Sequence, residues 1–148
     1  MCVNAANGNG IPSDYNPHAM KDRSNFTILG EHVESPWPAN IEAEGVFRKR
    51  PGELDLGTWR PDSGTSVATA IAASVAALIL QFGRAHADSV NNIDRLRGVA
   101  VITRFFKLMV DHNKERIHGF MNIVPWLLFN IKDRQSLCRT FVEELMTM

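Results

Sequence analysis

Residues 64–69, with the sequence GTSVAT, place a serine where its hydroxyl could serve as a nucleophile. Ser66 follows a Gly-containing turn and opens a run without charged residues that continues to Phe82. At a helix N-terminus, backbone N–H groups and the helix dipole favour the negative charge that develops when a carbonyl is attacked. A serine hydroxyl needs such donors, and a base that takes its proton, to act as a nucleophile. Ser66 is therefore a candidate catalytic residue.

The run behind Ser66 predicts a helix over residues 66–80 that is buried on nearly every side, and we expect Gly83 to end it as a C-cap. The apolar part, residues 67–80, is shorter than the ~20 residues that a bilayer requires. We therefore expect a soluble core helix and no membrane span. A simpler role for Thr65 or Ser66 is that of an N-cap, whose side-chain oxygen accepts a free N–H of the first turn.

A second polar segment lies near the start of the chain, where residues 5–9 read AANGN. A side-chain amide in this segment could donate a second hydrogen bond to an oxyanion. The same short string of Asn and Gly also predicts a simple turn.

Together these segments resemble the subtilisin-like serine peptidases. Residues 64–69 and the small residues behind them are similar to the family's serine motif, usually written G-T-S-M-A-x-P-x-x-A-G, although Ala70 stands in place of its proline. Residues 5–9 are similar to its A-A-A-G-N segment. The resemblance implies a serine-type endopeptidase in which Ser66 is the nucleophile and the Asn9 side chain and the Ser66 N–H stabilise the oxyanion. Asn7 takes the place of Asn9 if the loop is displaced by two residues.

The Asp and His motifs of that family, D-T/S-G and H-G-T, precede the A-A-A-G-N segment, and this sequence contains neither. None of the five histidines lies in an H-G-T context, so we assign no general base to any of them; they are His18, His32, His86, His112 and His118. Two interpretations follow. The chain is either part of an endopeptidase domain or a non-catalytic, truncated remnant or interaction module of the same fold.

The resemblance implies an α/β fold, a parallel sheet with helices on both faces, of which this chain is expected to be the carboxy-terminal half. We expect residues 1–85 to form this part of the peptidase domain and residues 86–148 to form a helical extension packed on it. Strands are predicted at the start of the chain and within residues 26–33, and helices from residues 91–92 and from Asp133. Residues 36–38 (PWP) should end regular structure, and residues 39–63 should form an exposed loop or hairpin.

Composition narrows the expected partners. Sixteen basic residues balance sixteen acidic ones, so net charge does not attract the chain to nucleic acid or anionic lipid, and the expected partner is a peptide or protein substrate. An unpaired edge strand near Val3 should also favour self-association. The two cysteines, Cys2 and Cys138, and the lack of a signal-peptide pattern favour a reduced, cytoplasmic protein. No metal-ligand spacing or nucleotide-binding glycine loop occurs, so we expect no cofactor; the resemblance allows calcium, without a matched site.

Overall fold

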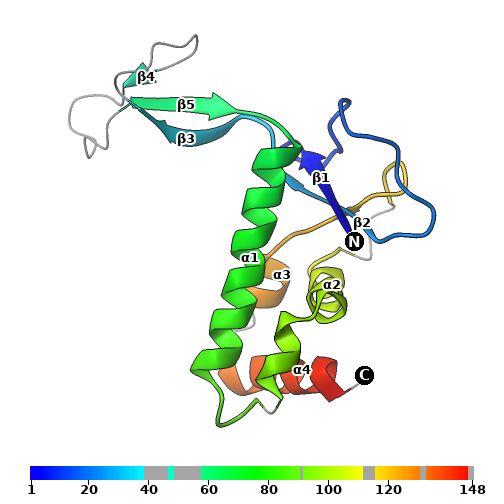
Figure 1. Ribbon diagram of the computed structural model, residues 1–148, viewed down its shortest axis with the longest axis vertical. Helices are drawn as coiled ribbons and strands as arrows, with labels where there is room; N and C mark the ends of the chain where they lie inside the picture. Colours follow the sequence, from blue (N-terminus) through cyan, green and yellow to red (C-terminus); the bar gives the residue numbers. More distant parts are fainter. Residues whose placement is uncertain (39–46, 49–57, 91, 112–115, 131–132, 147–148) are drawn as a thin grey trace.

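The computed structural model describes residues 1–38, 47–48, 58–90, 92–111, 116–130 and 133–146 of the chain (Figure 1). Six strands, four α-helices and one 3-10 helix are described: β1 (Cys2–Ala6), β2 (Asn25–Leu29), β3 (Val33–Trp37), β4 (Phe47–Arg48), β5 (Thr58–Asp62), α1 (Thr65–Ala85), η1 (Ile93–Arg97), α2 (Val99–Leu108), β6 (Met121–Asn122), α3 (Trp126–Phe129) and α4 (Arg134–Met146). They form a parallel sheet in the order β1-β2-β6 and an antiparallel sheet in the order β3-β5-β4. The fold is therefore mixed α/β, with a small parallel sheet flanked by helices.

The two faces of the parallel sheet differ in chemistry. Ala5 of β1 and Phe26 of β2 belong to one face, where Ala5 lies beside Ala68 of α1 and the Phe26 ring meets Phe106 of α2 edge to face at 5.7 Å. The opposite face carries a polar row in register across the three strands, Asn4, Thr27 and Asn122. We expected helices on both faces of the sheet, but α1 and α2 both cover the apolar face.

Gly30 fixes the start of α1 to the carboxyl ends of β1 and β2. Its N–H donates to the carbonyl of Ala6 at 2.9 Å, and its own carbonyl accepts the N–H of Gly64 at 2.8 Å. A Cβ atom at Gly30 would lie 2.7 Å from the Cβ of Ala5 and 2.9 Å from the Cβ of Ala68. Only glycine therefore allows strand and helix to approach this closely.

Helix α1 departs from expectation in two ways. It runs through Gly83 to Ala85, so the prediction of Gly83 as the C-cap is wrong. Gly83 instead faces the interior, where a Cβ would overlap Leu96. Its buried residues form one stripe, and Leu78 on another side is 56% exposed, so the prediction of burial on nearly every side is also wrong. The stripe consists of Ala68, Ala72, Val75, Ile79 and Gly83.

The length and mean hydropathy of α1 would also suit a membrane span, with a mean hydropathy of 1.8 over 18 residues, of which 28% are buried. Core helices of soluble proteins meet the same criterion. The length and hydropathy of α1 therefore do not show whether this helix spans a membrane.

The outer edge of β1 is partly covered by the loop that follows it. The Asn16 side chain forms two hydrogen bonds with the backbone of Ala5: its Nδ2 donates to the Ala5 carbonyl at 2.7 Å, and its Oδ1 accepts the Ala5 N–H at 3.1 Å. The N–H of Ser13 also donates to the Ala5 carbonyl, at 3.0 Å. The Asn16 side chain thus forms the hydrogen bonds that a neighbouring strand would form. We expected an unpaired edge strand, but this edge is partly covered. Self-association stays a prediction.

We expect Asn16→Asp to lower the free energy of unfolding by about 1–3 kcal/mol, because a carboxylate cannot donate to the Ala5 carbonyl. The exposed edge should also promote association, visible as dimers or larger species in analytical ultracentrifugation. Asn9→Asp is the matched control, since it introduces the same charge at an exposed position of the same loop. Equal urea midpoints and sedimentation for the two variants would contradict this role of Asn16.

We expected residues 86–148 to be helical, but they also contain a strand. They contribute β6, which pairs with β2 in the parallel sheet. The predicted helix from residues 91–92 begins as η1, is interrupted at Gly98 and continues as α2. A cluster of aromatic rings joins this part to α1, because Phe141 of α4 packs against Phe82 at 4.7 Å and Phe105 at 4.5 Å between ring centroids. The hydrophobic core therefore includes residues on both sides of position 85.

Helix α4 starts where the sequence predicted, immediately after Asp133. The Asp133 carboxylate accepts hydrogen bonds from the Ser136 hydroxyl at 2.7 Å, the Ser136 N–H at 2.9 Å and the Gln135 N–H at 3.2 Å. These donors, the Ser136 hydroxyl first, hold the pKa of Asp133 below its usual value. The cap is thus fully formed above the ordinary pKa of an aspartate and is lost as the pH falls through the lowered one.

The antiparallel sheet extends away from the α1 body (Figure 1). β3 includes Pro36 and ends at Trp37, so the prediction that residues 36–38 end regular structure is confirmed. β3 is an edge strand, where a proline without an N–H is tolerated. β4 and β5 confirm a hairpin-like arrangement within residues 39–63, of which 39–46 and 49–57 lie outside the described residues.

Candidate active site

Ser66 is the second residue of α1, and its side chain is exposed. The N-cap of the helix is Gly64, and no side chain caps this end, so Thr65 and Ser66 do not act as the N-cap. A Cβ at Gly64 would lie 3.3 Å from the Ser66 Oγ. Because glycine has no Cβ, the hydroxyl is not covered on this side. In the described part of the chain, the Ser66 hydroxyl takes part in no hydrogen bond.

The backbone beside Ser66 offers free donors. The first amide of α1 with an acceptor is that of Ala68, which donates to the Gly64 carbonyl at 3.1 Å. Among the described residues, no acceptor is bound to the N–H groups of Thr65, Ser66 and Val67. Such unpaired amides at a helix start attract anions and can stabilise an oxyanion.

Two residues from earlier parts of the chain, one through its backbone and one through its side chain, form hydrogen bonds close to the turn that carries Ser66. The backbone N–H of His32 donates to the Ser63 Oγ at 2.9 Å, and the Tyr15 hydroxyl donates to the Gly30 carbonyl at 3.3 Å. The Ser63 N–H in turn donates to the Asp62 carboxylate at 2.8 Å. No sequence pattern indicated Tyr15, because its position depends on the tertiary path of the loop after β1.

Asn9 and Asn7 have different surroundings. The Asn7 Oδ1 accepts the N–H groups of Asn9 at 3.0 Å and Ile11 at 3.1 Å, so Asn7 organises the turn after β1. The Asn9 side chain is exposed, and no hydrogen bond holds it in the described structure. Of the two candidate oxyanion donors, Asn9 is therefore the one whose whole side chain remains free to bind.

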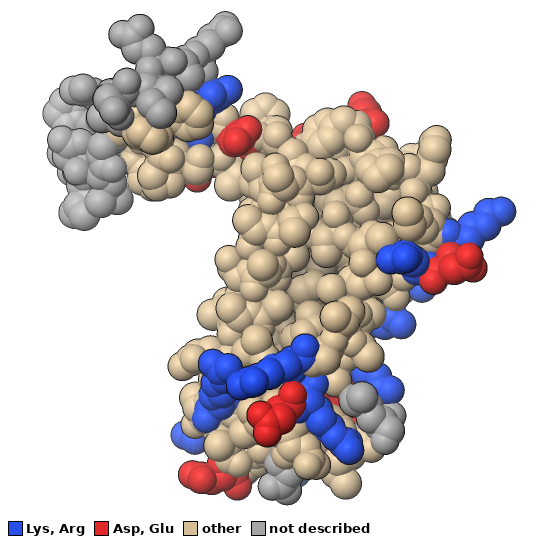
Figure 2. Space-filling view, viewed as in Figure 1, with Lys and Arg blue, Asp and Glu red and all other residues tan. Residues whose placement is uncertain are grey.

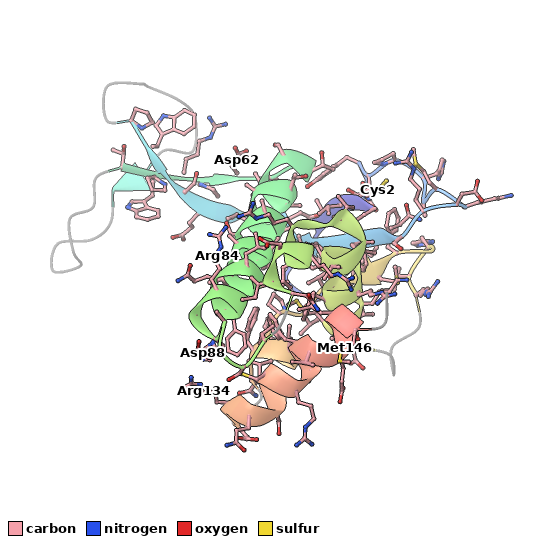
Figure 3. The ribbon with its side chains drawn as sticks, turned by 60° about the horizontal axis from the view of Figure 1, so that its bottom comes forward. Cys2, Asp62, Arg84, Asp88, Arg134 and Met146 are labelled. Atoms are coloured by element: carbon pink, nitrogen blue, oxygen red, sulfur yellow. The ribbon has the colours of Figure 1, made fainter. Side chains whose placement is uncertain are left out.

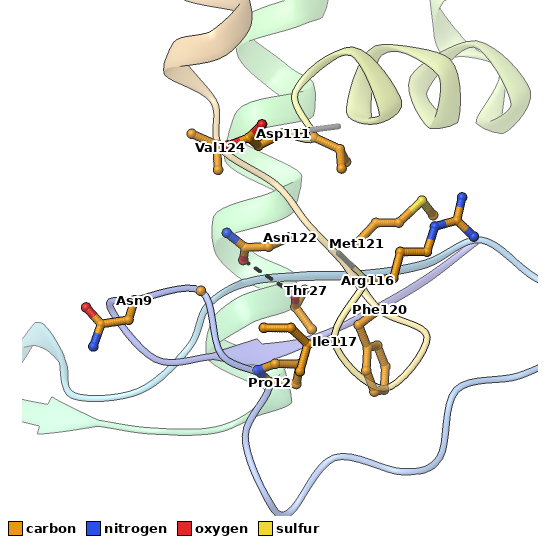
Figure 4. A pocket seen from close by; sticks show the side chains of 12 residues that line it. Asn9, Pro12, Thr27, Asp111, Arg116, Ile117, Phe120, Met121, Asn122 and Val124 are labelled. Atoms are coloured by element: carbon orange, nitrogen blue, oxygen red, sulfur yellow. Dashed lines mark hydrogen bonds between the residues drawn. The ribbon is translucent and has the colours of Figure 1, made fainter. Parts of the chain in front are cut away.

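Asn9 lies at the rim of a small cavity of about 70 Å³ on the polar side of the parallel sheet (Figure 4). Its floor contains the Thr27 hydroxyl, which donates to the Asn122 Oδ1 at 3.4 Å. Twelve residues line it: Asn9, Gly10, Pro12, Thr27, Val110, Asp111, Arg116, Ile117, Phe120, Met121, Asn122 and Val124. Ser66 is not among them. The structure thus brings Ser66 and the loop of Asn9 to the same end of the sheet but does not place both in one cavity.

No described histidine forms a hydrogen bond with Ser66. The His86 Nδ1 donates to the Phe82 carbonyl at 2.8 Å, and this residue follows the far end of α1, roughly 30 Å from Ser66 at 1.5 Å per residue. His18 and His118 line a separate cavity, and His112 lies outside the described residues. Of the described histidines, His32 is the one whose backbone is hydrogen-bonded at the Ser66 turn.

Among the residues that the structure describes, no group of three or more His, Cys, Asp or Glu side chains could hold a metal ion. No protein-family model, curated protein or solved structure matches this chain.

Proposed function

We propose that this chain is the nucleophile-bearing, carboxy-terminal half of a subtilisin-like serine endopeptidase domain. The observation that carries the proposal is the Ser66 turn, where an exposed, unbonded hydroxyl lies next to three free backbone amides. This turn adjoins the carboxyl ends of parallel strands, where ligands bind in open α/β sheets. Small residues behind Ser66 let α1 pack closely on the sheet and so hold the turn in place.

In the proposed reaction, a histidine from outside these 148 residues removes the Ser66 proton as Oγ attacks a peptide carbonyl, and an aspartate orients that histidine. The carbonyl oxygen becomes an oxyanion, which accepts the Ser66 N–H and the side-chain amide of Asn9. The same histidine then donates its proton to the leaving amine, and water releases the acyl group from Ser66.

A second candidate function is a non-catalytic interaction module of the same fold. It is favoured by one observation: within the described residues, no base is hydrogen-bonded to the Ser66 hydroxyl. Without a base, the hydroxyl remains a weak nucleophile.

A fluorophosphonate probe distinguishes the two candidates. We expect little labelling of the purified chain alone and site-specific labelling of Ser66 when 4-methylimidazole is added as an external base, because the hydroxyl is exposed and the free amides can stabilise the adduct. Mass spectrometry of the labelled peptide identifies the site. Ser66→Ala should abolish the labelling.

Ser74→Ala is the matched control, since the Ser74 hydroxyl is also on α1 but donates to the Ala70 carbonyl at 3.0 Å. This variant should be labelled like the unmodified chain. If Ser66 is not labelled above the level of other serines with the external base present, the endopeptidase proposal fails and the interaction module remains.

A further inference from the structure

A second cavity, distant in sequence from the Ser66 turn, lies beside the first turns of α4. Its volume is about 490 Å³, within the range of roughly 300–1,000 Å³ that is usual for small-molecule sites. One wall is Ser89, in the turn after α1, and the others come from α4. The residues that line it are Ser89, Arg134, Gln135, Cys138, Arg139 and Val142.

The charged side chains that line this cavity, Arg134 and Arg139, are both positive. Arg134 and Arg139 are both exposed at its walls. In the view of Figure 2, several Lys and Arg side chains gather at this end of the molecule, with Asp or Glu side chains among them. Figure 3 places Arg84 and Arg134 at the same end, with Asp88 between them. A guanidinium group presents a planar fork of donors that matches phosphate and carboxylate oxygens. The arginine pair therefore favours an anionic ligand.

Neutral donors complement the two arginines. In the described residues, neither the Ser89 hydroxyl nor the Gln135 side-chain amide is used in a hydrogen bond within the protein. The nearby Asp133 carboxylate, by contrast, already accepts three hydrogen bonds at the start of α4. The side chains that remain available in the cavity are thus predominantly donors.

We propose that this cavity binds a small organic phosphate monoester, with Arg134 and Arg139 holding its phosphate group. Phosphate offers three acceptor oxygens, enough for two guanidinium groups and a hydroxyl donor. The apolar contact available to the rest of the ligand is Val142 and the Cys138 side chain. None of the described residues that line the cavity is aromatic, so they offer no stacking surface of the kind that a nucleobase prefers.

The position of Cys138 provides a direct assay. In a Cys2→Ser background, Cys138 is the remaining thiol, a largely buried side chain that contributes to the cavity wall. O-phospho-L-serine should slow its alkylation by N-ethylmaleimide, a neutral reagent, and calorimetry should give the affinity. Loss of two charge-assisted hydrogen bonds in Arg134→Gln/Arg139→Gln should weaken binding at least about tenfold. Arg97→Gln, which removes an exposed arginine outside this cavity, should leave binding unchanged.

Four results would overturn the proposal. The first is that L-serine protects Cys138 as well as O-phospho-L-serine does, and the second is that the double arginine variant, with an unchanged thermal melt, binds as tightly as its parent. The third is that succinate binds as tightly as O-phospho-L-serine, which would assign the cavity to carboxylates. Inorganic phosphate should bind more weakly than the monoester, because it lacks the part that contacts Val142; equal affinity would reject the organic ligand.

Discussion

Gly30→Ala should destabilise the fold by about 1–3 kcal/mol, the cost typical of inserting a methyl group into a packed interior. The new Cβ would lie 2.7 Å from the Cβ of Ala5 and 2.9 Å from the Cβ of Ala68. Both of these atoms are attached directly to backbone, so no side-chain rotation can relieve the overlap, and α1 must move away from β1. Urea unfolding monitored by circular dichroism measures the effect.

Gly8→Ala is the control for this substitution. A Cβ at Gly8 would have no neighbour within 4 Å. The free energy of unfolding of this variant should therefore stay within about 0.5 kcal/mol of that of the unmodified chain. Because the Gly30 carbonyl accepts the Gly64 N–H, Gly30→Ala should also reduce fluorophosphonate labelling of Ser66 in the presence of the external base. An unfolding midpoint equal to that of Gly8→Ala would show that the contact between α1 and β1 is looser than described.

Phe141→Ala should have the larger effect, a loss of about 3–5 kcal/mol, as for other large-to-small substitutions of buried aromatic residues. Phe141 is fully buried and packs against both Phe82 of α1 and Phe105 of α2. Removing its ring leaves a cavity where residues 86–148 meet α1. Thermal unfolding should shift to lower temperature as a single transition, because one core contains residues from both parts of the chain.

Met146→Ala on the same helix is the comparison, since that side chain is 72% exposed and should contribute within about 0.5 kcal/mol. Two separate transitions in Phe141→Ala, one of them unchanged from the parent chain, would show that residues 1–85 fold independently of α4.

The local elements of this fold could be predicted where a residue type acts on its own neighbours. Asp133 marks the start of α4 because its carboxylate binds amides two and three residues ahead. The glycine and hydroxyl residues at 64–66 mark the start of α1. Burial of α1 could not be predicted in the same way, since alanine suits both a buried and an exposed side of a helix. The pattern therefore did not distinguish a one-sided stripe from a fully enclosed helix.

Features that depend on distant residues had no local signal. β6 is two residues long, and its place beside β2 is set by contacts with Phe26 and Thr27 near the other end of the chain. The cover that Asn16 provides for β1 depends on how a loop returns to the strand. For the candidate site, Ser66 is exposed, as its predicted role as a nucleophile requires, but the sequence could not show that Asn9 borders a cavity that Ser66 does not line.

The pairing of β2 with β6 has a consequence for how this protein is made. The middle strand of the sheet obtains one of its two neighbours from residues that follow it by about 95 positions, as the bond between Thr27 and Asn122 shows. Because synthesis proceeds from the amino terminus, β2 has only one of its two neighbouring strands until residues 121–122 have been synthesised. Contacts of such long sequence separation slow folding and prolong exposure of strand edges. The sheet is therefore completed well after β1 and β2 have been synthesised.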